Sequence, residues 1–266
     1  MKYFLLSFLL ISTLFSSELK LTKKQANYVA DKVWQNEGAG LDKYLIHWNV
    51  GENFASVGIG HFIWFAKGHK EKFREVFPML VKFMEQRSVK MPYWLNHRTH
   101  LPWKSKKIFY RAKKAKTKKY RELFKFLKKT KSYQAEFMAK RLTKALPKIL
   151  AVIKNPRKKA NIKWRFNHIL YNKNGTINAQ GLYILLDYVN FKGEGTLASE
   201  GYHGEGWGLL QVLENMKFSK NKSRFKSFGQ SASYVLSRRI KNSPKKRGEE
   251  RWRKGWNVRL KTYWNY

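Results

Sequence analysis

The sequence of 266 residues contains no cysteine. The absence of thiols excludes a disulfide-stabilised scaffold, a zinc site built on thiolates and a catalytic cysteine. Acidic residues are also scarce, because 17 Asp and Glu stand against 56 Lys and Arg, for a formal charge of +39. A charge of this size repels itself and predicts an anionic partner, such as nucleic acid, anionic lipid or an acidic cell-wall polymer.

Long apolar runs are missing after the first residues of the chain. The apolar segment 3–15 follows Lys2 and precedes the small residues Ser16 and Ser17. This pattern is typical of a secretory signal peptide, and the run is shorter than the roughly 20 residues of a membrane span. An uncleaved anchor is the alternative. We expect residues 1–17 to be a signal peptide, no transmembrane segment after its removal, and a periplasmic or secreted protein. Nucleic acid is then possible but less favoured as a partner.

Apolar residues are abundant enough for a packed core. They make up 43% of the chain, and 16% of the residues are aromatic, which excludes a disordered basic tail. Helical spacing dominates, whereas the glycine-broken segment 41–65 indicates short strands. We therefore expect a mainly helical α+β fold, with a small N-terminal β-sheet and a larger helical lobe. Helices are expected over 22–37, 70–85 (kinked or split at Pro78), 182–189, 207–216 and 225–240.

Positive charge is concentrated in the middle of the chain. The segment 100–173 contains 25 Lys and Arg but only two acids, Glu122 and Glu136. Apolar residues within it are spaced as in amphipathic helices. Either the lysines are solvated outer faces of these helices, or they form a dedicated anion-binding surface, and both can hold.

A possible general acid lies at the end of the first predicted helix. Glu37 follows Val33 by four residues and so continues the apolar stripe, before Gly38 and Gly40 end the helix. Burial favours the neutral form of a carboxyl group, which is the form that a general acid requires. An ion pair with a lysine is the alternative. About twenty residues later, the segment 56–61 reads Ser-Val-Gly-Ile-Gly-His, whose glycines permit close backbone approach.

These two motifs together resemble the phage-type lysozymes (endolysin muramidases) of the lysozyme-like superfamily. Three later segments follow in the family's order: 185–193, 208–215 and 255–260. The resemblance implies a lysozyme-like fold, with residues 18–266 as a single domain. The segment at about 66–175 lies outside the resemblance and is expected to be a basic helical insertion.

The resemblance also implies roles for particular residues. Glu37 would protonate the leaving glycosidic oxygen, and Ser56 would stand where the family has a Thr that positions a water. His61 would tie the sheet to the neighbouring helix. The family's second carboxylate has no clean counterpart, since Asn49 or Val50 falls near its place and Glu52 is close but shifted. The predicted catalytic residues are thus Glu37, Ser56 and Glu52. The residues predicted to bind substrate are Asn49, Gly58, Gly60, His61, Glu194, Glu205 and Trp207.

The route of cleavage stays open at this point. Glycoside hydrolysis normally uses two carboxyl groups roughly 5–9 Å apart, and the candidates for the second are Glu52, Asp42, Glu194 and Glu205. A single-acid, transglycosylase-like route is an alternative, because the segment 208–211 is similar to a motif of lytic transglycosylases. No metal or cofactor is expected, since the histidines show no metal-binding spacing.

We therefore expect an exported, peptidoglycan-cleaving glycoside hydrolase of the muramidase type. Its positive charge would attract the carboxylates of peptidoglycan and associated anionic polymers. The alternative is a non-catalytic, cationic exported protein that binds cell wall, anionic envelope polymers or nucleic acid.

Overall fold

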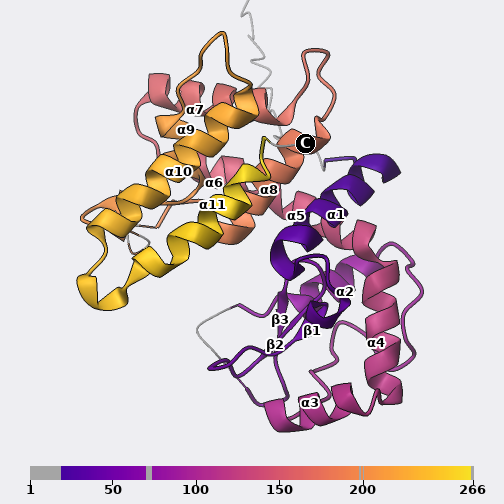
Figure 1. Cartoon of the computed structure of the whole chain (residues 1–266). Coiled ribbons are helices and arrows are strands. Elements are labelled where there is room, and N and C mark those ends of the chain that lie inside the picture. Colours follow the sequence, from indigo (N-terminus) through magenta and orange to yellow (C-terminus); the bar gives the residue numbers. More distant parts are fainter. Residues whose placement is uncertain (1–18, 70–73, 198, 200, 265–266) are drawn as a thin grey trace, which may run out of the picture.

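The computed structural model describes residues 19–69, 74–197, 199 and 201–264. The predicted signal peptide, residues 1–17, lies outside the described residues. The predicted mainly helical fold with a small N-terminal sheet is confirmed, and the structure shows that this sheet is antiparallel. Figure 1 shows two groups of elements, which meet where α1 (Lys23–Gly38) packs against α5 (Lys131–Leu142).

The first group surrounds the small sheet (Figure 1). Its elements are β1 (Ile46–His47), β2 (Ala55–Val57), β3 (Phe62–Trp64), α2 (Phe77–Glu85), α3 (Lys106–Lys114) and α4 (Lys118–Lys129). The second group is helical apart from one short hairpin. Its elements are α6 (Ala145–Ala151), α7 (Pro156–Leu170), α8 (Ala179–Lys192), β4 (Gly201–Tyr202), β5 (Glu205–Gly206), α9 (Leu209–Asn215), α10 (Arg224–Asn242) and α11 (Arg253–Lys261).

Helix α1 begins at a capping box. The Thr22 hydroxyl accepts from the Gln25 N–H, and the Gln25 side chain accepts from the Thr22 N–H, which satisfies two free donors of the first turn. The helix runs through Gly38 and ends where Ala39 takes a left-handed conformation, with φ of 50°. Glu37 therefore lies in the last turn, next to the sheet.

The sheet has strand order β1-β2-β3, and both pairs are antiparallel. His47, Ser56 and Ile63 are paired across the three strands and so share one face. Ile46, Val57 and Phe62 share the opposite face, and all three are buried. The face that carries Ser56 is the more open one, because its outer members are only partly buried.

The central helix comes from the segment that was expected to be an insertion. Helix α5 packs against α1, α2 and α8, and so joins the two groups of elements. Its Gln134 is fully buried, donates to the Leu127 carbonyl (2.7 Å) and accepts from the Ile59 N–H (2.8 Å). Gly58 has φ of +77°, and a Cβ there would lie 2.4 Å from the Gln134 Oε1. The turn after β2 is thus fastened to α5.

Helix α2 begins at Phe77, later than the predicted segment 70–85, of which 70–73 lie outside the described residues. Pro78 occupies the first turn, where its missing N–H costs nothing, so it begins the helix instead of kinking it. In the described ranges, no helix combines the length and the apolar character needed to cross a membrane.

Helix α8 is buried on nearly all sides, as its apolar sequence predicts. Gly181 packs closely against α7, since a Cβ there would lie 1.9 Å from the Ile169 carbonyl oxygen. We expect Gly181→Ala to lower the free energy of unfolding by about 3 kcal/mol or more, because the backbone of α7 has to move. The matched control is Gly255→Ala, at a helical position with open space around it. It should be neutral or stabilising by up to about 1 kcal/mol in urea unfolding, and equal effects of the two changes would contradict this packing.

Candidate functional site

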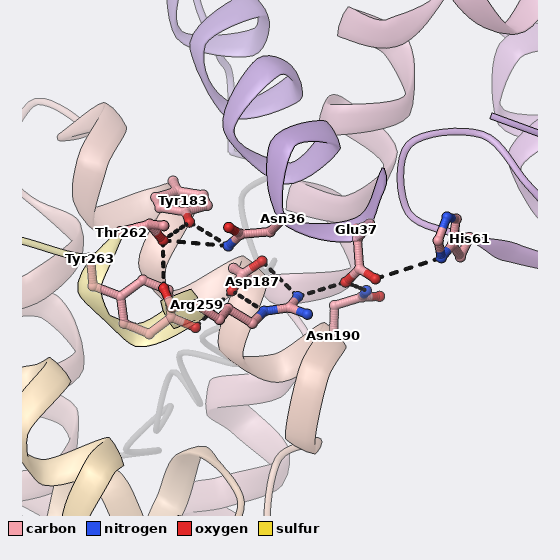
Figure 2. A network of polar contacts seen from close by, with 9 residues as sticks. All are labelled: Asn36, Glu37, His61, Tyr183, Asp187, Asn190, Arg259, Thr262 and Tyr263. Carbon is pink, nitrogen blue, oxygen red and sulfur yellow. Dashed lines mark hydrogen bonds and ion pairs between the residues drawn. The ribbon is translucent and has the colours of Figure 1, made fainter. Parts of the chain in front are cut away.

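Glu37 is part of a polar network drawn from four separate segments (Figure 2). Its Oε1 accepts from the Arg259 Nη2 of α11 at 2.6 Å and from the Asn190 Nδ2 of α8 at 3.2 Å. Its Oε2 lies 3.7 Å from the His61 Nδ1, in the turn between β2 and β3. The side chain is 16% exposed. One oxygen is therefore held by two donors, whereas the other faces His61 beyond hydrogen-bonding distance.

Arg259 is held from behind by a fully buried carboxylate. Asp187 is 0% exposed and accepts from the Arg259 Nε (2.9 Å) and Nη2 (2.8 Å), and from the Tyr263 hydroxyl (2.7 Å). Burial opposes the charged form of Arg259, but Asp187 and then Glu37 raise its pKa well above the ordinary value. Arg259 is thus charged, and Asp187 supplies most of its compensation.

A neutral cluster fixes the same corner of the structure (Figure 2). The Asn36 Nδ2 of α1 donates to the Tyr183 hydroxyl at 2.6 Å, and that hydroxyl is 2.5 Å from the Thr262 Oγ1. Thr262 in turn donates to the Arg259 carbonyl at 2.7 Å. Burial raises the pKa of Tyr183, so its hydroxyl stays protonated. These bonds hold α11 against α1 and α8, and they fix the position of the Arg259 guanidinium.

A groove of about 370 Å³ opens beside Glu37. We call it the Glu37 groove, and its lining residues are Glu37, Gly60, His61, Phe62, Ile63, Val76, Arg141, Asn190, Phe191 and Arg259. His61 has φ of 46°, a conformation that residues other than glycine rarely adopt and that is concentrated at functional sites. The groove thus brings together a carboxyl group, an imidazole, an amide and two guanidinium groups.

Three of the predicted site residues meet in this groove: Glu37, Gly60 and His61. Ser56 is 5% exposed and lies on the sheet face of Ile63, which lines the groove, but Ser56 itself does not line it. Gly58 packs against α5 instead of facing the groove.

The other predicted residues lie elsewhere. Asn49 donates to the Glu52 carboxylate at 3.0 Å, so these two side chains pair with each other in the β1–β2 loop. Glu205 pairs with Arg238 at 2.7 Å on the β4–β5 hairpin. The ring of Trp207 lies 4.0 Å from the Arg239 guanidinium. None of these four lines the Glu37 groove.

Glu194 lines an adjoining hollow and pairs with Lys148 at 2.9 Å. Among the described residues that line the Glu37 groove, Glu37 is the one acid. Asp187 is close to Glu37, but it is fully buried and hydrogen-bonded to Arg259, so it does not reach the groove. A second carboxyl group across the groove, as in a two-carboxylate glycosidase, is therefore not found in the described ranges.

The surroundings of Glu37 also differ from the apolar environment that the helix stripe predicts. Polar partners from α8, α11 and the β2–β3 turn contact its carboxyl group. Asn190 and Arg259 belong to the segments 185–193 and 255–260 that carry the lysozyme resemblance, but no role was predicted for them. Asp187 is the residue that could have indicated this network. It is an acid inside a nearly all-apolar helix, and a buried charge requires a partner of opposite charge.

Lys192 lies close to this network. Its Nζ is 3.9 Å from the ring centroids of Phe191 and Trp256. Burial, together with Arg239 and Arg259, lowers its pKa from 10.5 to about 7, although Glu249 opposes the shift.

This lysine makes stability depend on pH. Between about pH 7 and pH 10 the unfolded chain keeps the Lys192 proton that the folded protein has released, so the free energy of unfolding rises with pH. We expect Lys192→Met to remove part of this rise and to stabilise the fold by about 1 kcal/mol at pH 6. Urea unfolding at pH 6 and pH 9 checks this, with the exposed Lys159→Met as control. A larger stabilisation at pH 9 than at pH 6 would contradict it.

No set of three or more His, Asp and Glu side chains is arranged as a metal site in the part of the chain that the structure describes. Comparisons with protein-family models, curated proteins and solved structures find no match to this chain. The chemistry of the Glu37 groove is therefore the main guide to function.

Proposed function

We propose that this protein is an exported lysozyme-like glycosidase that cleaves peptidoglycan, with Glu37 as its general acid. One observation carries the proposal: a carboxyl group at a helix end lines a groove, with one oxygen held and the other free of donors within hydrogen-bonding distance. A proton donor has to be fixed in position and reachable by the substrate at the same time.

The segments that supply the contacts of Glu37 also support the proposal. Glu37, His61, Asn190 and Arg259 come from four segments that carry the resemblance to phage-type lysozymes, and in the fold they make one network (Figure 2). Segments so far apart in the chain do not converge on one carboxyl group by local preference.

Arg259 can orient Glu37 and does not depend on Glu37 alone for a counter-charge. Because Asp187 takes two hydrogen bonds from the guanidinium, Arg259 keeps its charge compensated when Glu37 is protonated. Glu37 can then gain and lose a proton without leaving an uncompensated buried charge behind it.

The lining of the Glu37 groove favours a route with one carboxyl group. In this route the Glu37 Oε2 gives its proton to the glycosidic oxygen as the bond between that oxygen and the anomeric carbon breaks. Water, or a hydroxyl of the substrate itself, then attacks the anomeric carbon, and the Glu37 carboxylate takes the proton that the nucleophile loses. The acid form is restored, and no second acid takes part.

The charge of +39 supports an anionic polymer as the partner. Attraction to the carboxylates of peptidoglycan would hold the protein on its substrate and would weaken as ionic strength rises. The non-catalytic alternative, a cationic protein that only binds the cell envelope, shares this salt dependence.

Turnover separates the two proposals. The protein without residues 1–17 is expected to lower the turbidity of a purified peptidoglycan suspension over time. Binding to the sedimented polymer without release of soluble fragments would contradict the enzymatic function and favour the binding protein.

A further inference from the structure

A second hollow, of about 220 Å³, adjoins the Glu37 groove. We call it the cationic hollow because four of its lining residues are basic: Arg74, Arg141, Lys144 and Lys148. Its apolar lining residues are Met79, Met138, Leu142, Leu186 and Val189. Glu194 is the one acid in this lining. A concave site with apolar walls and several like charges concentrates ions of the opposite charge.

The positive charge of this hollow is not balanced by the described residues. Glu194 is engaged by Lys148 at 2.9 Å. No carboxylate in the described ranges pairs with Arg74, Arg141 or Lys144, so the hollow keeps an excess of positive charge. Arg74, Arg141, Lys144 and Lys148 are all exposed, so an anion can reach them from solvent. Several like charges gathered in one hollow favour the binding of an ion of opposite charge.

The two hollows share part of their lining. Arg141 and Asn190 line both, and Asn190 also donates to Glu37. A polymer strand whose glycosidic bond lies at Glu37 would therefore pass Arg141 and bring its next substituent to the cationic hollow. The basic residues of the hollow all come from the segment 66–175, outside the resemblance to phage-type lysozymes.

We propose that the cationic hollow binds an anionic group, a carboxylate or a phosphate, carried by the polysaccharide strand next to the sugar at Glu37. The inference rests on the proposed function, because it assumes that a glycan occupies the Glu37 groove. Guanidinium groups bind both anions through paired hydrogen bonds, and the lysines add point charges. The hollow would thus make the protein prefer acidic strands over neutral ones.

The test compares binding to three insoluble glycans by sedimentation, at about 0.15 M salt. The first keeps its stem peptides, the second is the same glycan after amidase removal of the peptides, and the third is peptide-free but keeps a phosphodiester-linked wall polymer. Glu37→Gln is used as the background, so that no substrate is consumed. We expect this protein to bind the first or the third glycan about tenfold more tightly than the second.

Arg74→Gln with Lys144→Gln is expected to abolish that preference and leave binding to the second glycan unchanged, because both residues line the cationic hollow and neither lines the Glu37 groove. The matched control is Lys159→Gln with Lys163→Gln, which removes the same charge from exposed positions on α7 outside the hollow. It should change all three affinities alike, by about twofold or less. Arg74→Lys keeps the charge but loses the paired hydrogen bonds, so it should keep part of the preference and guards against a folding defect.

A preference for the first glycan assigns a carboxylate, and a preference for the third assigns a phosphate. Equal binding to all three glycans, or equal losses from the hollow and control variants, overturns the inference. Cleavage by the protein with Glu37 intact is measured separately. A preference without cleavage would overturn the proposed glycosidase function and support anion binding by the cationic hollow. Cleavage without a preference would support the glycosidase function and overturn anion binding by the hollow.

Discussion

Glu37→Gln is expected to slow peptidoglycan lysis by about 10²- to 10⁴-fold, the range that a positioned general acid contributes. The amide has nearly the shape of the carboxyl group, and its oxygen can still accept from Arg259 and Asn190. It has no acidic proton to give to the leaving oxygen. The initial rate of turbidity loss measures the effect.

Two controls make this result specific. Glu205→Gln changes an acid that pairs with Arg238 outside the groove, so lysis should stay within about twofold of the unchanged protein. Sedimentation of Glu37→Gln with the same peptidoglycan should still be complete, because the change alters the net charge of this strongly basic protein by only one. Equal lysis rates for Glu37→Gln and Glu205→Gln would remove Glu37 from the reaction.

Asp187→Asn is expected to lower the free energy of unfolding by about 3–5 kcal/mol, the usual cost of leaving a buried charge without its partner. Arg259 is only 13% exposed, and Asp187 is its main counter-charge. With an amide at 187, Glu37 becomes the one carboxylate beside the guanidinium, so lysis should fall as well. Urea unfolding and the turbidity assay measure the two effects.

The double change Asp187→Asn with Arg259→Met distinguishes the effect on stability from the effect on lysis. Removing both charges should recover part of the lost stability but not the lysis, because Glu37 then lacks its orienting donor. Asp31→Asn is the surface control, since Asp31 is 65% exposed in its pair with Lys131, and it should cost about 0.5 kcal/mol or less. Stability unchanged by Asp187→Asn would contradict the role given to the buried pair.

Local features of the fold follow closely from the sequence. The capping box at Thr22 and Gln25 forms as the residue types predict, and the glycine-broken segment 41–65 folds as the three short strands. The apolar segment 182–189 lies inside α8. Each of these features depends on residues within a few positions of one another, so periodicity and capping chemistry are sufficient to find them.

Features that depend on distant contacts do not follow in this way. The sequence predicts a basic insertion over 66–175, and in the structure this segment contains the central helix α5. Its place at the centre does not follow from the sequence, because the burial of Gln134 depends on its contact with the β2–β3 turn. The β4–β5 hairpin is missed since its strands, Gly201–Tyr202 and Glu205–Gly206, are too short to show alternation.

In the candidate site, too, residues in local motifs are predictable from the sequence and distant partners are not. Glu37 and His61 are found from local motifs, and the structure brings them within 3.7 Å of each other. Arg259 stands 222 residues after Glu37, and no local pattern indicates that they touch. The position of Glu52 in the sequence predicts a catalytic role, but its carboxylate pairs with Asn49 instead of lining the groove.

The most direct test of the central claim, that Glu37 protonates a glycosidic oxygen, is the chemical identity of the ends that are created. Peptidoglycan digested by the protein is analysed by mass spectrometry for new sugar ends, either reducing ends from attack by water or internal ethers from attack by a substrate hydroxyl. We predict one of these ends in proportion to lysis, and only traces with Glu37→Gln. Soluble fragments without new sugar ends, or new ends formed equally fast by Glu37→Gln, would contradict the account.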